Sequence, residues 1–553
     1  MRWIPAAVLF ICLMLQTTAA QDSAQAALTG RVEKLFEKWA KPDSPGCALS
    51  VIQDGKIVYE HGFGMADLDH DISISPGTVF HVASVSKQFT ATSIVLLAQR
   101  GKLSLDDEVR KYIPELPDFG PQVTIRHLLH HTSGLRDQWT LLGLAGWRYS
   151  LDLITDDDVL AVMARQHDLN FPPGDRYLYC NTGYTLLAQI VKRVSGQSFR
   201  EFTTASIFGP LGMKNTHFRD DHAEIVKNMA YGYMPSKETF KLSITNFDTV
   251  GATSLLTTVE DLALWDQNFY EPRVGGKAVI DQLLQRGKLN NGEQLDYAFG
   301  LTLGQYKGLP VVDHAGADAG YRADLLRFPE QHFSVACLCN LGTINPSELT
   351  RQVADVYLEG KLKVEGPKSD APTLKLSESQ LSPKAGIYHN PDGDAIRRII
   401  YKDGALRAAR GDNSIELKAL SETQFRPAGQ QMTVRFEDAG PGKPMRLVEV
   451  PDGGKPDVYE RVEEFTPTAA QMQEYAGIYV SDEIEPLYRI AVREGKLVLE
   501  RLKSEPTTLQ PATRDLFSGG PGTIRFTRDP NGSVSGFILN AGRVRNFRFD
   551  KRR

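Results

Sequence analysis

The amino-acid sequence predicts an α+β domain followed by two small antiparallel β-barrels. Segments with helical and with strand-like periodicity are mixed up to residue 358, and a polar, proline-bearing stretch follows at 359–374. After that stretch the sequence changes to short strands and turns, in a pattern that occurs twice. We therefore predict a first domain at 21–358, a linker at 359–374, and barrel repeats at 375–463 and 464–553.

The evidence for a duplication is a pair of short motifs that recur at one offset. Ala385-Gly386-Ile387-Tyr388 returns as Ala476-Gly477-Ile478-Tyr479, and Asp403-Gly404 returns as Glu494-Gly495. Each copy is about as long as a small antiparallel barrel requires.

Residues 1–20 have the pattern of a cleaved secretory signal. Arg2 supplies the positive charge, Ala6–Leu15 the apolar stretch, and Thr18-Ala19-Ala20 a small-residue cleavage site. The apolar run is too short to span a bilayer, so we expect a periplasmic or secreted protein without a membrane span. The net charge is −5 and no block of Lys or Arg stands out, so nucleic acid is not an expected partner.

Four cysteines follow the signal: Cys47, Cys180, Cys337 and Cys339. They are too few for a disulfide framework in a chain of this length. Cys337 and Cys339 are two apart on a predicted strand, a spacing that rarely forms a bridge. We interpret Cys337 and Cys339 as small buried apolar residues, because a zinc site would need two more ligands nearby.

The remaining elements are predicted from periodicity and turn chemistry. Residues 25–40 have the spacing of an amphipathic helix, and residues 46–59 contain two apolar runs around Asp54-Gly55, a favoured hairpin turn. Farther along, a glycine-rich stretch leads into a helix for which Thr257 or Thr258 is the expected cap.

Ser84 and Lys87 form a Ser-x-x-Lys motif just ahead of Ala91–Ala98, an apolar run that predicts a buried helix. Residues three apart share a helix face, so the hydroxyl and the amine can meet. Burial and the positive end of the helix dipole disfavour the charged form of Lys87, and a neutral amine can take the proton of a serine nucleophile. The alternative is that Ser86 caps the helix and Lys87 is solvated.

Three histidines raise the question of a metal site. His127 and His131 are four residues apart, with His130 between them, but no Glu stands between them as it does in a zinc protease helix. Ser133-Gly134 then ends the helix. We favour capping and packing roles and predict no metal.

Tyr179 and Asn181 belong to a loop ahead of a helix predicted at Tyr184–Val194. In an extended loop, residues two apart point to the same side. A phenol beside a cationic lysine can act as general base or acid, and an amide can hold both a substrate carbonyl and Lys87. Taken alone, Tyr179 fits equally well as a packed ring with a bonded hydroxyl.

His314 and Gly316 share one face of a predicted strand that ends in a glycine turn. Gly316 would let a ligand approach the backbone, and the amide of Ala317 could stabilise an oxyanion.

The three motifs follow one another in the order found in the serine β-lactamase/penicillin-binding superfamily. Together with the flanking segments Leu129–Leu135 and Phe171–Gly174, they make residues 27–358 resemble the branch of class C β-lactamases, D-aminopeptidases and D-Ala-D-Ala carboxypeptidases. The resemblance implies a β-lactamase-like α/β sandwich with an antiparallel sheet and an all-helical subdomain. The two barrels resemble those of three-domain D-stereospecific aminopeptidases, in which they border the active site.

The resemblance also implies roles for individual residues. Ser84 would attack a carbonyl and form an acyl-enzyme, while Lys87 and Tyr179 share the proton transfers. Asn181 would orient the substrate, and the backbone amides of Ser84 and Ala317 would form the oxyanion hole.

His314 stands where many members carry a lysine, and histidine has less charge at neutral pH, as in the D-aminopeptidase and esterase members. We therefore predict an exported serine hydrolase without a cofactor, which acts on peptides or amides of D-amino acids as a D-aminopeptidase or D,D-carboxypeptidase. The alternatives are an esterase, a weak β-lactamase that hydrolyses a β-lactam, and a penicillin-binding or sensing protein with slow deacylation. An adhesion module with an inert catalytic remnant is disfavoured by the intact motifs, and a homodimer is left open.

Overall fold

The computed structural model describes residues 26–363, 374–411, 413–428, 430, 432–440, 442–451 and 455–552. The predicted signal at 1–20 and residues 364–373 of the predicted linker lie outside these ranges. The described residues form two compact units: 26–134, 149–161 and 171–363 in the first, and 135–148, 162–170 and the rest of the chain in the second. No helix within the described ranges has the length and apolar character needed to cross a membrane.

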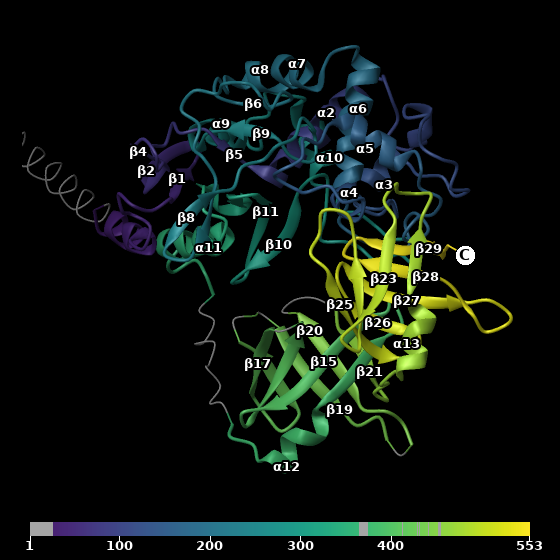
Figure 1. The fold of residues 1–553 in the computed structure, drawn as a ribbon. Helices are drawn as coiled ribbons and strands as arrows, with labels where there is room; N and C mark the ends of the chain where they lie inside the picture. The colour runs from purple at the N-terminus through teal and green to yellow at the C-terminus, as the bar shows by residue number, and fades with distance from the viewer. Residues whose placement is uncertain are drawn as a thin grey trace, which may run out of the picture. The chain divides into compact units, whose positions relative to one another are not determined.

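The first unit is built on a six-stranded antiparallel sheet in the order β10-β11-β12-β13-β1-β2 (Figure 1). Its strands are β1 (Cys47–Gln53), β2 (Lys56–Phe63), β10 (Thr302–Tyr306), β11 (Leu309–Asp318), β12 (Tyr321–Phe328) and β13 (Phe333–Cys339). Strands β1 and β2 are the predicted hairpin, and both turn residues, Asp54 and Gly55, have positive φ, as a type I′ turn requires. Strand β1 also pairs with β13, so the start of this unit is joined to its end.

Successive side chains of β1 point to opposite faces of the sheet, and each face is packed against a helix. Leu49 lies in the apolar cluster that contains Val353 of α11 (Pro346–Tyr357). Ser50 points the other way and donates to the carbonyl of Val259 at 3.2 Å, at the start of α9 (Val259–Gln267). The sheet is therefore covered by helices on both faces, and the predicted sandwich is confirmed.

The other helices of the catalytic domain include the predicted helical subdomain. They are α2 (Lys87–Gln99), α3 (Ile125–Leu129), α5 (Asp156–Met163), α6 (Asn181–Ser195), α7 (Phe199–Thr203), α8 (Gly209–Leu211) and α10 (Gly276–Leu283). Short strands accompany them: β3 (Met65–Asp67), β4 (Ile72–Ser73), β5 (Phe80–His81), β6 (His217–Phe218), β7 (Tyr233–Ser236), β8 (Thr239–Leu242) and β9 (Leu255–Thr257). A helix also covers residues 26–36, within the range predicted for the first helix.

Helix α6 begins at Asn181, three residues before the predicted start at Tyr184. The sequence pattern treats Gly183 as part of the loop, but in the structure this glycine lies in the first turn of α6. A Cβ on Gly183 would lie 3.4 Å from the carbonyl oxygen of Leu128 in α3. A side-chain methyl group would be in ordinary van der Waals contact with α3 there, so Gly183 belongs to the packed start of α6 rather than to a turn.

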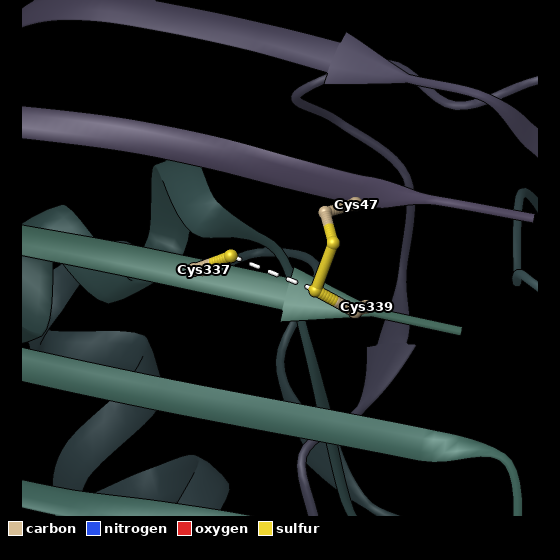
Figure 2. Close-up of side chains that lie close together, drawn as sticks. All are labelled: Cys47, Cys337 and Cys339. Atoms are coloured by element: carbon tan, nitrogen blue, oxygen red, sulfur yellow. Dashed lines mark hydrogen bonds between the residues drawn. A yellow bond between two sulfur atoms is a disulfide. The ribbon is translucent and has the colours of Figure 1, made fainter. Parts of the chain in front are cut away.

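Two cysteines form a disulfide, so the interpretation of Cys339 as an apolar packing residue is wrong. Cys47 and Cys339 are bonded through their Sγ atoms, with a sequence separation of 292 (Figure 2). They lie directly opposite each other in the β1–β13 pairing, which the local spacing of Cys337 and Cys339 does not reveal. Cys337 is a buried thiol whose Sγ lies 3.6 Å from that of Cys339, and burial raises its pKa.

Each C-terminal repeat is a closed antiparallel barrel of eight strands, as predicted (Figure 1). The first comprises β14 (Gly386–Asn390), β15 (Ala395–Lys402), β16 (Ala405–Arg410), β17 (Asn413–Ala419), β18 (Gln424–Pro427), β19 (Met432–Glu437), β20 (Arg446–Pro451) and β21 (Asp457–Val462). The second comprises β22 (Gly477–Val480), β23 (Tyr488–Arg493), β24 (Lys496–Glu500), β25 (Thr507–Thr513), β26 (Leu516–Gly519), β27 (Gly522–Arg528), β28 (Val534–Ala541) and β29 (Val544–Lys551).

Equivalent contacts in the two barrels support the duplication. A capped helix precedes each barrel: α12 (Glu378–Leu381) and α13 (Ala469–Tyr475). The hydroxyl of Tyr388 donates to the carbonyl of Lys384 at 2.7 Å, and that of Tyr479 donates to the carbonyl of Tyr475 at 2.6 Å. The same tyrosine thus ties the first strand of each barrel to the residue four positions before it.

The second unit also contains α4 (Gln138–Leu144), which comes from the sequence between two catalytic motifs. The adjacent Arg136 forms an ion pair with Glu483 of the second barrel at 2.5 Å, and both side chains are almost fully buried. The backbone amide of Asp137 donates to the carbonyl of Arg543. Residues 135–148 therefore fold with the barrel that follows them far along the chain.

Candidate active site

Ser84 and Lys87 lie at the point where a short 3₁₀ turn, Ala83–Ser86, continues into α2. The Nζ atom of Lys87 donates to the Oγ atom of Ser84 at 3.1 Å. Lys87 has no exposed surface, so the alternative of a solvated lysine is wrong. Ser86 makes no side-chain cap; its hydroxyl instead accepts from the backbone amide of Leu255 at 3.1 Å.

Two carbonyl oxygens frame the amine of Lys87. Its Nζ atom donates to Oδ1 of Asn181 at 3.0 Å and to the backbone oxygen of Ala252 at 2.7 Å. Carbonyl oxygens can only accept, so each of these contacts uses one N–H. The same nitrogen contacts Ser84: as an ammonium it donates to the hydroxyl, and as a neutral amine it can accept the hydroxyl proton. The geometry suits a general base.

Tyr179 lies beside the same lysine. The Nζ atom of Lys87 is 4.9 Å from the centre of the Tyr179 ring, and the ring of His131 is 4.2 Å from that of Tyr179. The Nδ1 atom of His131 accepts from the backbone amide of Cys180 at 3.1 Å, which holds the loop just before α6. The structure therefore brings Ser84, Lys87, Tyr179 and Asn181 together, while their individual roles stay predictions.

His314 is a neutral side chain whose two ring nitrogens both have partners. Its Nδ1 atom lies 2.7 Å from the backbone oxygen of Ala315, an acceptor, so the proton is on Nδ1. Its Nε2 atom then accepts from the hydroxyl of Tyr297 at 3.0 Å. Burial and the nearby charge of Lys87 lower the pKa of His314 to about 3. His314 is therefore uncharged at neutral pH.

Gly316 has a different role from the one expected. We expected it to let a ligand approach the strand, but a Cβ at this position would lie 2.2 Å from the carbonyl oxygen of Val82. The space is taken by the turn that leads to Ser84, so the glycine allows the strand to contact the nucleophile element directly.

The segment of β11 around Ala317 has a strand partner on one side. Pairing of β11 with β10 covers Leu309–Asp313, whereas pairing with β12 continues to Asp318. The backbone of Ala317 therefore extends past the end of β10, where a substrate could lie alongside the strand. Its assignment to the oxyanion hole stays a prediction.

The histidine run has the capping and packing roles that we favoured. Thr124 caps α3 by accepting from the backbone amide of His127, and Nδ1 of His127 accepts from the amide of Thr124 at 3.2 Å. The Nε2 atom of His130 lies 3.1 Å from the carbonyl of Gln285. The groups of acidic, histidine and cysteine side chains close enough to hold a metal, within the described ranges, do not include these residues.

Sequence patterns missed several groups at this site. Ala252 contributes a backbone oxygen, and the glycine-rich stretch that contains it was interpreted only as a lead into α9. Tyr297 has no local motif at all. His81 lies three residues before Ser84 and Asp318 directly after Ala317, whereas Thr253 follows Ala252 in the glycine-rich stretch and had no motif beside it.

The chain matches one family model, described as Beta-lactamase, over residues 32–357. Penicillin-binding protein 4* of Bacillus subtilis (strain 168) is 30% identical over 428 residues, covering 74% of this chain and 94% of that protein. A D-aminopeptidase of Gluconobacter oxydans (strain 621H) is 26% identical over 551 residues, covering 96% of this chain and 99% of that protein.

Among solved structures, the octameric penicillin-binding protein homologue from Pyrococcus abyssi superimposes with a TM-score of 0.54 at 26% identity. The match covers 79% of this chain and 99% of that one. The family model, the relatives and the fold agree with the resemblance inferred from the motifs. The chain is a serine hydrolase that belongs to the beta-lactamase family.

Proposed function

We propose that this protein cleaves peptides or amides of D-amino acids through an acyl-enzyme on Ser84, as a D-aminopeptidase. The observation that carries the proposal is the amine of Lys87, which two carbonyl oxygens orient toward the hydroxyl of Ser84. The relative from Gluconobacter oxydans, which is named a D-aminopeptidase and aligns over nearly the whole chain, supports the choice of substrate.

The contacts of Lys87 suggest the order of proton transfers. Neutral Lys87 takes the proton of Ser84 as Oγ bonds to the substrate carbonyl carbon, and the carbonyl oxygen becomes an oxyanion near the Ala317 amide. The proton then passes to the leaving amine, with Tyr179 as a second carrier, and the C–N bond breaks. Water, deprotonated by the same groups, attacks the acyl-enzyme and releases the acid and free Ser84.

The state of His314 favours an aminopeptidase over the other activities of this fold. A neutral imidazole, already bonded to Tyr297 and Ala315, offers no cation to a substrate carboxylate. Tight binding of the carboxylate of a β-lactam or of a C-terminal D-alanine is therefore not expected. An esterase remains the second candidate, since an ester needs no such cation.

We also infer that the protein is exported. Residues 1–20 have the pattern of a secretory signal, and the disulfide between Cys47 and Cys339 is typical of proteins that fold in an oxidising compartment. The homodimer that the sequence left open stays a prediction.

The test is hydrolysis of a small panel by the purified mature protein. D-alanine p-nitroanilide, its L-enantiomer, p-nitrophenyl acetate and a chromogenic cephalosporin are compared in the wild type and in Ser84→Ala. Ser93→Ala serves as a matched control, because this buried serine of α2 only donates to the carbonyl of Phe89 at 2.9 Å. We expect turnover of the D-anilide over the L-form, lost in Ser84→Ala and kept in Ser93→Ala.

Other outcomes discriminate between the candidates. Turnover of the ester alone would assign an esterase, and activity that survives Ser84→Ala would refute the nucleophile. A stable acyl-enzyme with the cephalosporin, without turnover, would favour a penicillin-binding or sensing protein.

A further inference from the structure

We propose that His81, Thr253 and Asp318 form a buried brace that positions Ser84 and the Ala317 amide for acyl transfer. The brace is a set of positioning residues, and its role rests on the proposed function of the same site. It consists of three polar side chains from three segments, each at most 5% exposed: His81 is 2%, Thr253 4% and Asp318 5% exposed.

The three side chains contact one another in a chain. The hydroxyl of Thr253 donates to Oδ2 of Asp318 at 2.6 Å. The Nε2 atom of His81 lies 3.4 Å from the Thr253 hydroxyl and 3.9 Å from Oδ2 of Asp318. At the other side of the imidazole, Nδ1 accepts from the backbone amide of Ala83 at 3.2 Å.

These contacts fix the direction of every hydrogen bond. Because Nδ1 of His81 accepts from Ala83, a neutral ring carries its proton on Nε2, facing Thr253. The single proton of the Thr253 hydroxyl goes to Asp318, so its oxygen is free to accept from His81. Burial and the charge of Arg219 lower the pKa of His81 to about 3, so the ring is neutral. Hydrogen bonds aligned in one direction reinforce one another.

Each end of the brace lies next to a residue of the predicted oxyanion hole. Ala83 immediately precedes Ser84 and has a φ of 49°, a conformation that non-glycine residues rarely adopt without support. The bond from its amide to His81 supplies part of that support. Asp318 immediately follows Ala317. The brace therefore links the two backbone segments whose amides must point at one oxygen atom.

The middle of the brace lies next to the base. Thr253 follows Ala252, whose backbone oxygen accepts from Lys87 at 2.7 Å. A shift of Thr253 would therefore move an acceptor that orients the amine. Because the strand at Gly316 already contacts Val82, the strand and the nucleophile turn have little space to move relative to each other.

The charge of Asp318 adds a second effect. No described residue lies within hydrogen-bonding distance of its Oδ1 atom, and burial raises the pKa of the carboxyl to about 7. The cations that face it are Lys87 from α2 and Arg322 from β12, while the neighbouring His81 is neutral. The charges of Lys87 and Arg322 oppose the effect of burial and favour the carboxylate form of Asp318.

The test is the rate of acylation of the full-length protein by p-nitrophenyl acetate, measured from the burst of nitrophenolate. Thr253→Val removes the hydroxyl at nearly constant volume, and Thr253→Ser restores it. The control is Thr350→Val, because the hydroxyl of Thr350 donates in the same way to the buried carboxyl of Asp324, which also accepts from Ser347 of α11.

We expect Thr253→Val to slow acylation about tenfold to a hundredfold with KM changed less than about threefold, since small displacements of reacting groups cost that much. Thr253→Ser should recover the rate to within about threefold, and Thr350→Val should change it less than about twofold. Equal rates in Thr253→Val and the wild type, or a Thr253→Ser as slow as Thr253→Val, would overturn the proposal.

If Thr253→Val does not fold, His81→Asn tests the same positioning role. Its side chain can still accept from Ala83 but is too short to reach Thr253, so we expect the same loss of acylation, and a full rate would overturn the brace. The ester readout also separates this proposal from the proposed function. Absence of D-anilide turnover bears only on the substrate class, whereas absence of any Ser84-dependent burst refutes the nucleophile itself.

Discussion

The disulfide between Cys47 and Cys339 closes a loop of 292 residues, so its removal has a large and calculable effect on stability. In the chain-entropy relation, cross-linking residues at a separation of 292 raises the free energy of the unfolded chain by roughly 6 kcal/mol at 25 °C. Native disulfides in practice contribute about 2–5 kcal/mol. We therefore expect the double variant Cys47→Ser/Cys339→Ser to lose about 4–6 kcal/mol of unfolding free energy in the catalytic domain.

The assay is urea unfolding followed by tryptophan fluorescence, to which Trp265, fully buried in this domain, contributes. Cys337→Ser is the matched control, because its thiol lies in the same core, 3.6 Å from Cys339, and closes no loop. This variant should lose about 1 kcal/mol, the cost of one buried polar replacement. Thiol titration of the denatured wild type should find two thiols, Cys180 and Cys337, before reduction.

Two results would refute this reasoning. One is a double variant that unfolds at the same urea concentration as Cys337→Ser, which would show that closure of the loop contributes nothing measurable. The other is a wild type with four titratable thiols after expression with its signal sequence in an exporting host, which would show that the disulfide does not form in the exported protein.

Three further predictions concern the site and the second unit. Asn181→Ala removes an acceptor that orients Lys87, and we expect a loss of about a hundredfold in kcat for the p-nitrophenyl ester with little change in KM; an unchanged kcat would contradict this role. The pKa of His314 is lowered to about 3, so its ring NMR signals should not shift between about pH 5 and 8. His70 is the control: the Asp67 carboxylate raises its pKa, and its ring signals should shift with pH. Since an unfolded histidine binds its proton near pH 6.5, the contribution of His314 to stability should fall as the pH drops below that value. Glu483→Gln breaks a buried ion pair and should cost about 3 kcal/mol in thermal unfolding, while Glu485→Gln, in an exposed pair, should cost less than about 1 kcal/mol.

Local chemistry predicted the parts of the molecule that depend on neighbours in sequence. The turn at Asp54-Gly55 requires positive φ at both positions, and Asn or Asp followed by Gly is the standard solution. Ser84 and Lys87 meet because residues three apart lie on one helical face. The barrel repeats were visible because the duplicated motifs keep the same spacing.

Contacts between distant segments could not be predicted in this way. The pairing of Cys47 with Cys339 follows from the register of β1 against β13, which depends on the whole sheet. Gly316 looks like a ligand-approach glycine, but it makes room for the backbone of the turn that leads to Ser84. A single sequence shows a glycine at such a position, but not which segment of the chain occupies the space beside it.

The frame around Lys87 shows why the reactive residues alone do not define this site. One of its two acceptors, the oxygen of Ala252, is a backbone group, and the loop that carries it is held by side chains of the nucleophile element itself. The hydroxyl of Thr90 donates to the carbonyl of Gly251 at 2.7 Å, and the hydroxyl of Ser86 accepts from the amide of Leu255 at 3.1 Å. The helix that carries the base thus also positions the loop that orients it. Substitution of these hydroxyl groups should therefore impair proton transfer even though neither of them touches Ser84 or a substrate.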